Sequence, residues 1–220
     1  MNTQRRLLLL PFILLCIHSV LLSQQADPVL PKKNGLAVGV KLTTFGPGIE
    51  FVYAIHPTIN LHAGAAYFRY NYNQDIESGD ATTRNAQVKF GTISLGADWQ
   101  FVSFMHVAAG MQFNFTQIDF DVFPTNPDAQ NNGVVAYQLK PNKLSPYISL
   151  GFGRTISKNK RVSVGFDIGV AYQGSMAVES SVKGDISDAK LHKWTNNIKS
   201  GSESYTYYPI INLQVAYRIF

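Results

Sequence analysis

Apolar and polar side chains alternate with a period of two along most of the chain from Gly35 onward. Successive side chains of a β-strand point to opposite faces, so this alternation predicts strands with one apolar and one polar face. No segment shows a helical pattern of any length, and we therefore expect an all-β chain. The pattern occurs in eight segments, at about 36–42, 49–55, 59–67, 93–101, 107–115, 147–153, 162–173 and 211–219.

The connections between the segments differ in length. Those after the second, fourth and sixth segments are short, the first hairpin is tight, and the others are long and polar, at about 74–86, 119–143 and 179–204. Short turns at one rim and long loops at the other are typical of an outer-membrane barrel. We predict an eight-stranded antiparallel up-and-down transmembrane β-barrel over residues 35–220. Residues 120–124 either extend the strands above the membrane or fold over the mouth of the barrel.

The first residues have the features of a secretory signal. Arg5 and Arg6 precede an apolar stretch over 7–22, which predicts a cleaved signal peptide at 1–23 and a short periplasmic segment at 24–34. The single cysteine, Cys16, lies in this segment, so a disulfide scaffold is excluded. We expect export and a location in the outer membrane of a Gram-negative bacterium.

The polar faces of the segments are built mainly from Gly, Ala, Ser, Asn and Gln. Only 15% of the residues are charged, against roughly a quarter in a typical soluble domain. Such faces suit a narrow lumen better than a surface in water, so we favour a membrane barrel over a soluble barrel with an apolar interior. The predicted interfacial aromatics are Tyr53, Tyr67, Trp99, Phe101, Tyr172 and Tyr217.

Four stretches carry a resemblance to a known class: GPGIE at 46–50, LSPYISLGFG at 144–153, GFDIGVAYQG at 165–174, and the end of the chain from YYP at 207–209 to Phe220. With them, the chain resembles the small eight-stranded outer-membrane barrels of Gram-negative bacteria, the OmpA/OmpX/OmpW-like class. The resemblance implies that Phe220 is the C-terminal aromatic read by the barrel-assembly machinery, a partner during biogenesis.

Charged residues on the inward faces are few, and burying a lone charge is costly, so we expect them to form pairs. They form either a structural network that fills the lumen or a gate whose pairs can exchange. The predicted charge network is Lys41, Glu50, Asp98, Asp167 and Arg218. The predicted polar lining is His62, Gln100, Gln112, Asn114, Tyr147, Gln173, Asn212 and Gln214.

Three classes of function remain open. We rank first a structural or surface-interaction role of the long loops, then a narrow channel for small solutes or small hydrophobic compounds. A lipid A-modifying enzyme comes last, because no His of the predicted mature chain has a Ser beside it and His56 and His106 lie at the short-turn rim. No catalytic residue, cofactor or metal site is expected.

The expected partners are outer-membrane lipid, lipopolysaccharide and an unknown extracellular ligand, with the chain a monomer. A net charge of +5 without a long Lys/Arg block does not indicate nucleic acid. The last loop is either solvated or a contact with lipopolysaccharide phosphates or a host surface. Its basic and aromatic residues are Lys183, Lys190, His192, Lys193, Trp194 and Lys199.

Overall fold

The computed structural model describes residues 35–220 except 73, 127–131, 154–155, 157–160 and 204. The predicted signal peptide and periplasmic segment lie outside the described residues. Eight strands form a ring: β1 (Gly35–Thr43), β2 (Gly46–His56), β3 (Ile59–Tyr72), β5 (Ala81–Val102), β6 (Met105–Asn114), β9 (Leu144–Gly153), β10 (Val162–Tyr172) and β12 (Tyr207–Arg218).

Each ring strand is antiparallel to both neighbours, and β12 pairs back with β1. A closed ring satisfies the backbone hydrogen bonds within the sheet, which hydrocarbon requires because it offers no partners. The predicted all-β, eight-stranded antiparallel barrel is confirmed.

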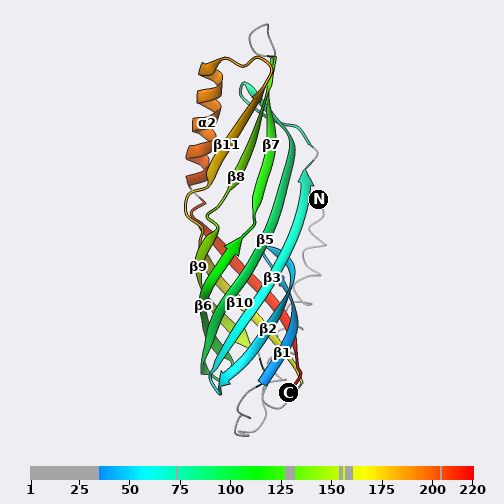
Figure 1. Ribbon diagram of the computed structural model, residues 1–220, viewed down its shortest axis with the longest axis vertical. Helices are drawn as coiled ribbons and strands as arrows, with labels where there is room; N and C mark the ends of the chain where they lie inside the picture. Colours follow the sequence, from blue (N-terminus) through cyan, green and yellow to red (C-terminus); the bar gives the residue numbers. More distant parts are fainter. Residues whose placement is uncertain (1–34, 73, 127–131, 154–155, 157–160, 204) are drawn as a thin grey trace, which may run out of the picture.

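Above one side of the barrel the sheet continues, as Figure 1 shows. Beyond the ring, β3 and β5 continue upward as a pair. Four further strands join them: β4 (Ile76–Ser78), β7 (Gln117–Pro124), β8 (Val134–Lys140) and β11 (Ala177–Lys183). In this part of the sheet β5, β7, β8 and β11 are adjacent in this order. The helix α2 (Asp188–Glu203) packs against this sheet. We call the upper parts of β3 and β5, with β4, β7, β8, β11 and α2, the extension.

The prediction that the long connections are loops was wrong, as was the absence of any helix. Residues 120–124 extend the strands, because Ile118, Phe120 and Val122 share one face of β7 and meet the apolar residues of β8. In α2 only Leu191, Trp194 and Ile198 reach this core, a narrow stripe in a polar segment. A short helix of this kind is stabilised mainly by tertiary packing, so its sequence pattern is weak.

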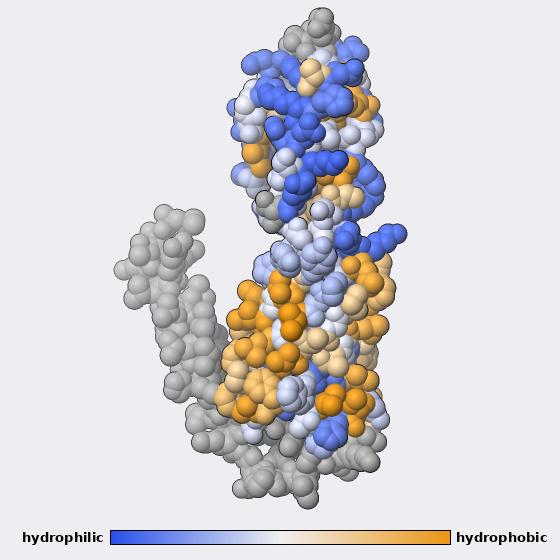
Figure 2. All heavy atoms as spheres, turned by 90° about the vertical axis from the view of Figure 1, so that its left-hand side faces the viewer, coloured by the Kyte–Doolittle hydropathy of each residue, from blue (hydrophilic) through white to orange (hydrophobic). Residues whose placement is uncertain are grey.

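The outer face of the barrel is apolar, whereas the extension is mainly hydrophilic (Figure 2). Along β12, Tyr207 and Tyr217 enclose Ile211, Leu213 and Val215, and all five are exposed. The ten residue steps from Tyr207 to Tyr217, at about 3.3 Å each and with a strand tilt of about 45°, span about 23 Å along the barrel axis. This is close to the height of the apolar band of outer-membrane barrels, about 25 Å. All six predicted interfacial aromatics are exposed: Tyr53, Tyr67, Trp99, Phe101, Tyr172 and Tyr217. Phe220 is also exposed, just after the end of β12.

Among the described residues, no helix has the length and apolar character needed to cross a membrane.

Candidate functional site

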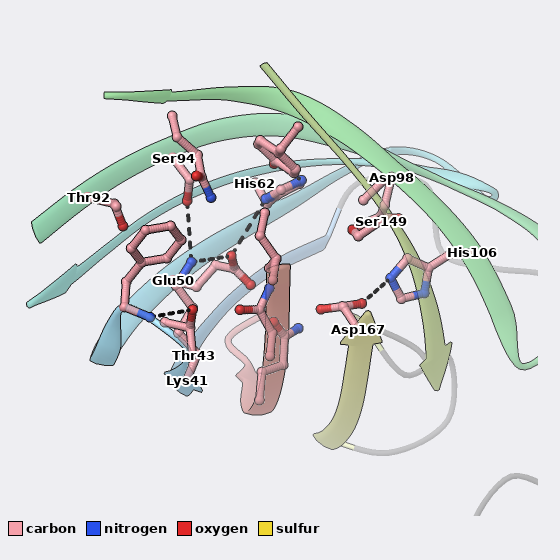
Figure 3. A pocket seen from close by; sticks show the side chains of 17 residues that line it. Lys41, Thr43, Glu50, His62, Thr92, Ser94, Asp98, His106, Ser149 and Asp167 are labelled. Atoms are coloured by element: carbon pink, nitrogen blue, oxygen red, sulfur yellow. Dashed lines mark hydrogen bonds and ion pairs between the residues drawn. The ribbon is translucent and has the colours of Figure 1, made fainter. Parts of the chain in front are cut away.

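One half of the barrel interior holds a chain of interacting side chains from the four neighbouring strands β1, β2, β3 and β5 and from β9 (Figure 3). Lys41 Nζ lies 3.0 Å from Glu50 Oε1 and donates to Ser94 Oγ at 3.3 Å. His62 Nδ1 lies 3.6 Å from the same oxygen of Glu50, and the hydroxyl of Tyr147 lies 3.2 Å from His62 Nε2. Lys41 and Glu50 expose only 8% and 9% of their side chains, so this ion pair is nearly dry.

The other half of the interior holds a second pair that the sequence analysis did not anticipate. His106 Nε2 lies 2.9 Å from Asp167 Oδ1, and Asn60 donates to Asp98 Oδ1 at 2.7 Å. His106 lies beside the short turn, as the second residue of β6, and its side chain is buried. His106 is separated from the inward residues of β6 by an even number of positions, so its side chain points to the same face. This spacing was the sequence signal that could have placed His106 inside the barrel.

Strand register explains why these side chains meet. Gly151 pairs with His106 on one side and with Asp167 on the other. A Cβ at Gly151 would overlap both side chains, so the missing side chain creates the space for the pair. In the same way, two glycines separate His62 from Tyr147 along one row of the sheet, and a Cβ at Gly96 would overlap the tyrosine hydroxyl.

The remaining predicted residues are spread along the lumen. Gln112, Asn212 and Gln214 line the same cavity as the ion pairs. Asn114 donates to Ser145 Oγ, and Gln100 donates to the carbonyl of Ser103.

Two further predicted residues lie towards the ends of the barrel. Gln173 is buried and donates its backbone N–H to the carbonyl of Thr206 at the upper end. Arg218 lies at the lower end of β12, opposite Ala37, and does not line the cavity. The structure therefore brings four of the five predicted charges into one region, with Arg218 apart.

An aromatic cluster lies at the upper end of the lumen. The rings of Phe45, Phe90 and Tyr208 contact one another with centroids 4.6–6.4 Å apart, and Phe45 is 1% exposed. Buried residues of β3, β9, β10 and β12 pack into the same cluster: Ala66, Tyr147, Ala171 and Ile210. The cluster thus receives side chains from all around the ring.

The cavity that remains below the cluster is small. Its volume is about 40 Å³, which is room for roughly three water molecules. Gln112 Oε1 is buried and has no partner among the described residues, so it is suited to hold one of these waters. Ser149 lines the cavity together with His106 and Asp167. A space of this size is much smaller than a lipid molecule.

No group of three or more His, Cys, Asp or Glu side chains that could hold a metal ion occurs in the described part of the chain.

The outward face of the extension is polar. Asp119 accepts hydrogen bonds from Gln138 at 2.8 Å, from Gln117 at 2.7 and 2.9 Å, and from Lys89 at 3.0 Å. Burial alone would raise the pKa of Asp119, but these hydrogen bonds and the ammonium charge outweigh it and hold the pKa below its usual value. The carboxylate is therefore a fixed anchor for Lys89.

The chain matches no protein-family model. No curated protein matches its sequence either. Among solved structures it is similar to CarO2 of Acinetobacter baumannii, with a TM-score of 0.58 and 18% identity over 84% of this chain and 98% of that one. CarO of the same organism aligns with a TM-score of 0.56 and 18% identity, over 87% and 99% of the two chains. A major outer membrane protein from Thermus thermophilus aligns with a TM-score of 0.39 and 13% identity, over 85% and 98%.

At these identities the likeness to CarO2 and CarO concerns the fold alone. It agrees with the closed ring and the apolar outer face, and the chain has the fold of the small outer-membrane β-barrels.

Proposed function

We propose that this outer-membrane β-barrel anchors the extension outside the cell, where the extension makes surface contacts, and that the barrel does not act as a pore. The observation that carries the proposal is the packing of side chains across the lumen. Phe45, Phe90 and Tyr208 pack together at its upper end, and the pair of Lys41 and Glu50 occupies the space below. We also propose that the chain is a monomer with its short turns in the periplasm.

The extension supports this role because it has a core of its own. Val122, Val135, Tyr137 and Leu139 are buried together with Trp194 of α2. A structure that stands above the membrane and buries its own apolar surface can present a constant set of polar side chains to a partner. The solvent side of α2 carries Lys190, His192, Lys193 and Lys199.

A narrow channel is the alternative, and the observation in its favour is the small polar cavity with the unpartnered Gln112 Oε1. Current through planar bilayers separates the two functions. We expect refolded wild-type protein to show no steady unitary current, and Phe45→Ala to show one. Phe166→Ala, on the lipid-facing side of β10, is the matched control and is expected to stay silent. A steady wild-type current that Phe45→Ala leaves unchanged would overturn the sealed-barrel proposal.

The surface role has its own test. Cells displaying the wild-type chain are compared with cells displaying a variant in which a short Gly/Ser linker replaces α2. Attachment is measured on surfaces coated with lipopolysaccharide or with extracellular-matrix protein. We expect attachment to fall to the level of cells without the protein. Equal attachment, with the barrel of the variant shown to be folded, would contradict the proposal.

A further inference from the structure

Three cations lie on the outward face just above the exposed aromatic side chains. Arg69 on β3 follows the exposed Tyr67 by two residues, so both point outward, and Arg69 pairs directly with Lys89 on β5. Lys140 on β8 comes one residue after Leu139, which pairs with Ile118 of β7. Because β7 lies between β5 and β8, Lys140 is two strands from Lys89, a spacing of about 10 Å. We call Arg69, Lys89 and Lys140 the cation row.

The height of the cation row is set by strand geometry. Lys89 lies ten residues above Trp99 along β5, which is a rise of about 23 Å at a tilt of about 45°. Lys140 lies at the same level as Lys89, because Leu139 pairs with Ile118 of β7 and Ile118 pairs with Val88 of β5. The apolar band of such barrels is about 25 Å tall. The row therefore lies where lipid headgroups begin.

The cations are held in place yet keep free donors. Lys89 Nζ lies 3.0 Å from Asp119 Oδ2, and Lys140 Nζ lies 3.0 Å from Glu179 Oε2. An ammonium group has three donors, so each lysine has two to offer to another acceptor. Arg69 takes part in none of the ion pairs between described residues. Such a set suits phosphate, which accepts charge-assisted hydrogen bonds from Lys and Arg.

A groove of about 470 Å³ lies on the same outward face, directly above the cation row. Carboxylates, amides and a hydroxyl offer donors and acceptors side by side, the combination that sugar hydroxyl groups need. Its polar lining includes Asn85, Gln87, Asp119, Asp121, Gln138 and Ser181.

The arrangement occupies one side of the barrel only. Among the described residues, the upper ends of β10, β12, β1 and β2 (170–172, 207–209, 42–44 and 46–48) carry no charge. If the barrel only attracted anionic lipid in general, we would expect cations all around its rim. Cations on one side, below a polar groove, fit one bound molecule.

We propose that the cation row and the groove bind the phosphorylated glucosamine headgroup of lipid A, so that one lipopolysaccharide molecule lies against this side of the barrel. Arg69, Lys89 and Lys140 bind the phosphates, and the groove binds sugar hydroxyls above them. The proposal names a partner for the proposed surface role and rests on the outer-membrane location. It does not depend on whether the lumen conducts.

The test uses the refolded full chain in detergent micelles, with lipid A as the probe and native mass spectrometry as the readout. We expect one lipid A per barrel, and much weaker binding of dephosphorylated lipid A with the same acyl chains. A cation near an anionic lipid surface contributes about fivefold in affinity. The triple variant Arg69→Gln/Lys89→Gln/Lys140→Gln should therefore bind on the order of a hundredfold more weakly.

The control variant is Lys183→Gln/Lys190→Gln/Lys199→Gln, which removes the same charge from β11 and α2, where Lys183 and Lys199 are exposed and Lys190 is half-buried. It should bind within about threefold of wild type, because these lysines lie away from the headgroup level. Heat-dependent mobility on SDS gels verifies that each barrel is folded, and Lys89→Arg should retain binding.

Equal weakening in both triple variants would overturn the proposal, as would equal binding of phosphatidylglycerol or inorganic phosphate. A chain that binds lipid A and also conducts current would keep this inference and lose the sealed-barrel proposal.

Discussion

Replacing Lys41 by methionine leaves the Glu50 carboxylate buried without the ammonium group that lies 3.0 Å away. Removing one partner of a buried pair typically costs about 3–5 kcal/mol, because the remaining charge stays desolvated. His62 Nδ1, 3.6 Å from the same oxygen, still offers partial compensation, so we expect the lower end, about 3 kcal/mol. The double variant Lys41→Met/Glu50→Gln removes both charges and should cost clearly less than Lys41→Met alone.

The assay is urea unfolding of the refolded chain in phospholipid vesicles, followed by tryptophan fluorescence and by mobility on unheated SDS gels. Arg84→Gln is the matched control, because it breaks an equally short pair, 2.8 Å from Asp75, in which both side chains are about half exposed. An exposed pair contributes about 0–1 kcal/mol. A cost below about 1 kcal/mol for Lys41→Met would show that water screens the lumen pair as it does the surface pair. The argument for a sealed interior would then fail.

Three other perturbations probe the packing and the extension. Gly151→Ala should prevent correct closure of the barrel, because the added Cβ would overlap His106. Gly201→Ala, which adds a Cβ in open space within α2, should instead stabilise the folded chain by up to about 1 kcal/mol. Mobility on SDS gels and urea unfolding measure both variants, and a Gly151→Ala variant at least as stable as Gly201→Ala would contradict this reasoning. Trp194→Ala should lower the free energy of unfolding of the extension by about 3–5 kcal/mol. Proteolysis within α2 should become faster, while the heat-dependent mobility of the barrel stays unchanged. Unchanged proteolysis would contradict the packing of α2 against the sheet. The folded pKa of Asp119 lies below its usual value of 3.8, so its stabilising contribution is complete above that pH and is lost as the pH falls through the folded pKa. The protection factors of the β7 amides, with the intrinsic pH dependence of exchange divided out, should therefore fall between pH 6 and 3 in wild type, and a fall of the same size in Asp119→Asn would refute this account.

The ring strands were predictable because alternation is a local property. Each ring strand buries one face in the lumen and exposes the other to lipid, so Leu36, Val38 and Val40 on β1 already mark its outer face in the sequence. The extension was not predictable in the same way. Its core forms only when β7, β8 and β11 lie side by side and Trp194 packs onto them from a helix with few apolar residues.

The polar interior shows a similar division. Inward positions follow from the period of two, and this was enough to select Lys41, Glu50 and Asp167 as lumen residues. Which residues pair depends on register across several strands, and His106 meets Asp167 only because Gly151 lies between them in neighbouring strands.

The sequence by itself determined the class of fold, the eight ring strands and the face that meets lipid, because all three depend on alternation within single strands. The tertiary structure alone decided that Phe45, Phe90 and Tyr208 pack together in the upper lumen, and that the long connections form an extension. It also brought Arg69 and Lys89 together below a groove. These features depend on contacts between segments far apart in the chain, and such contacts leave no local period in the sequence.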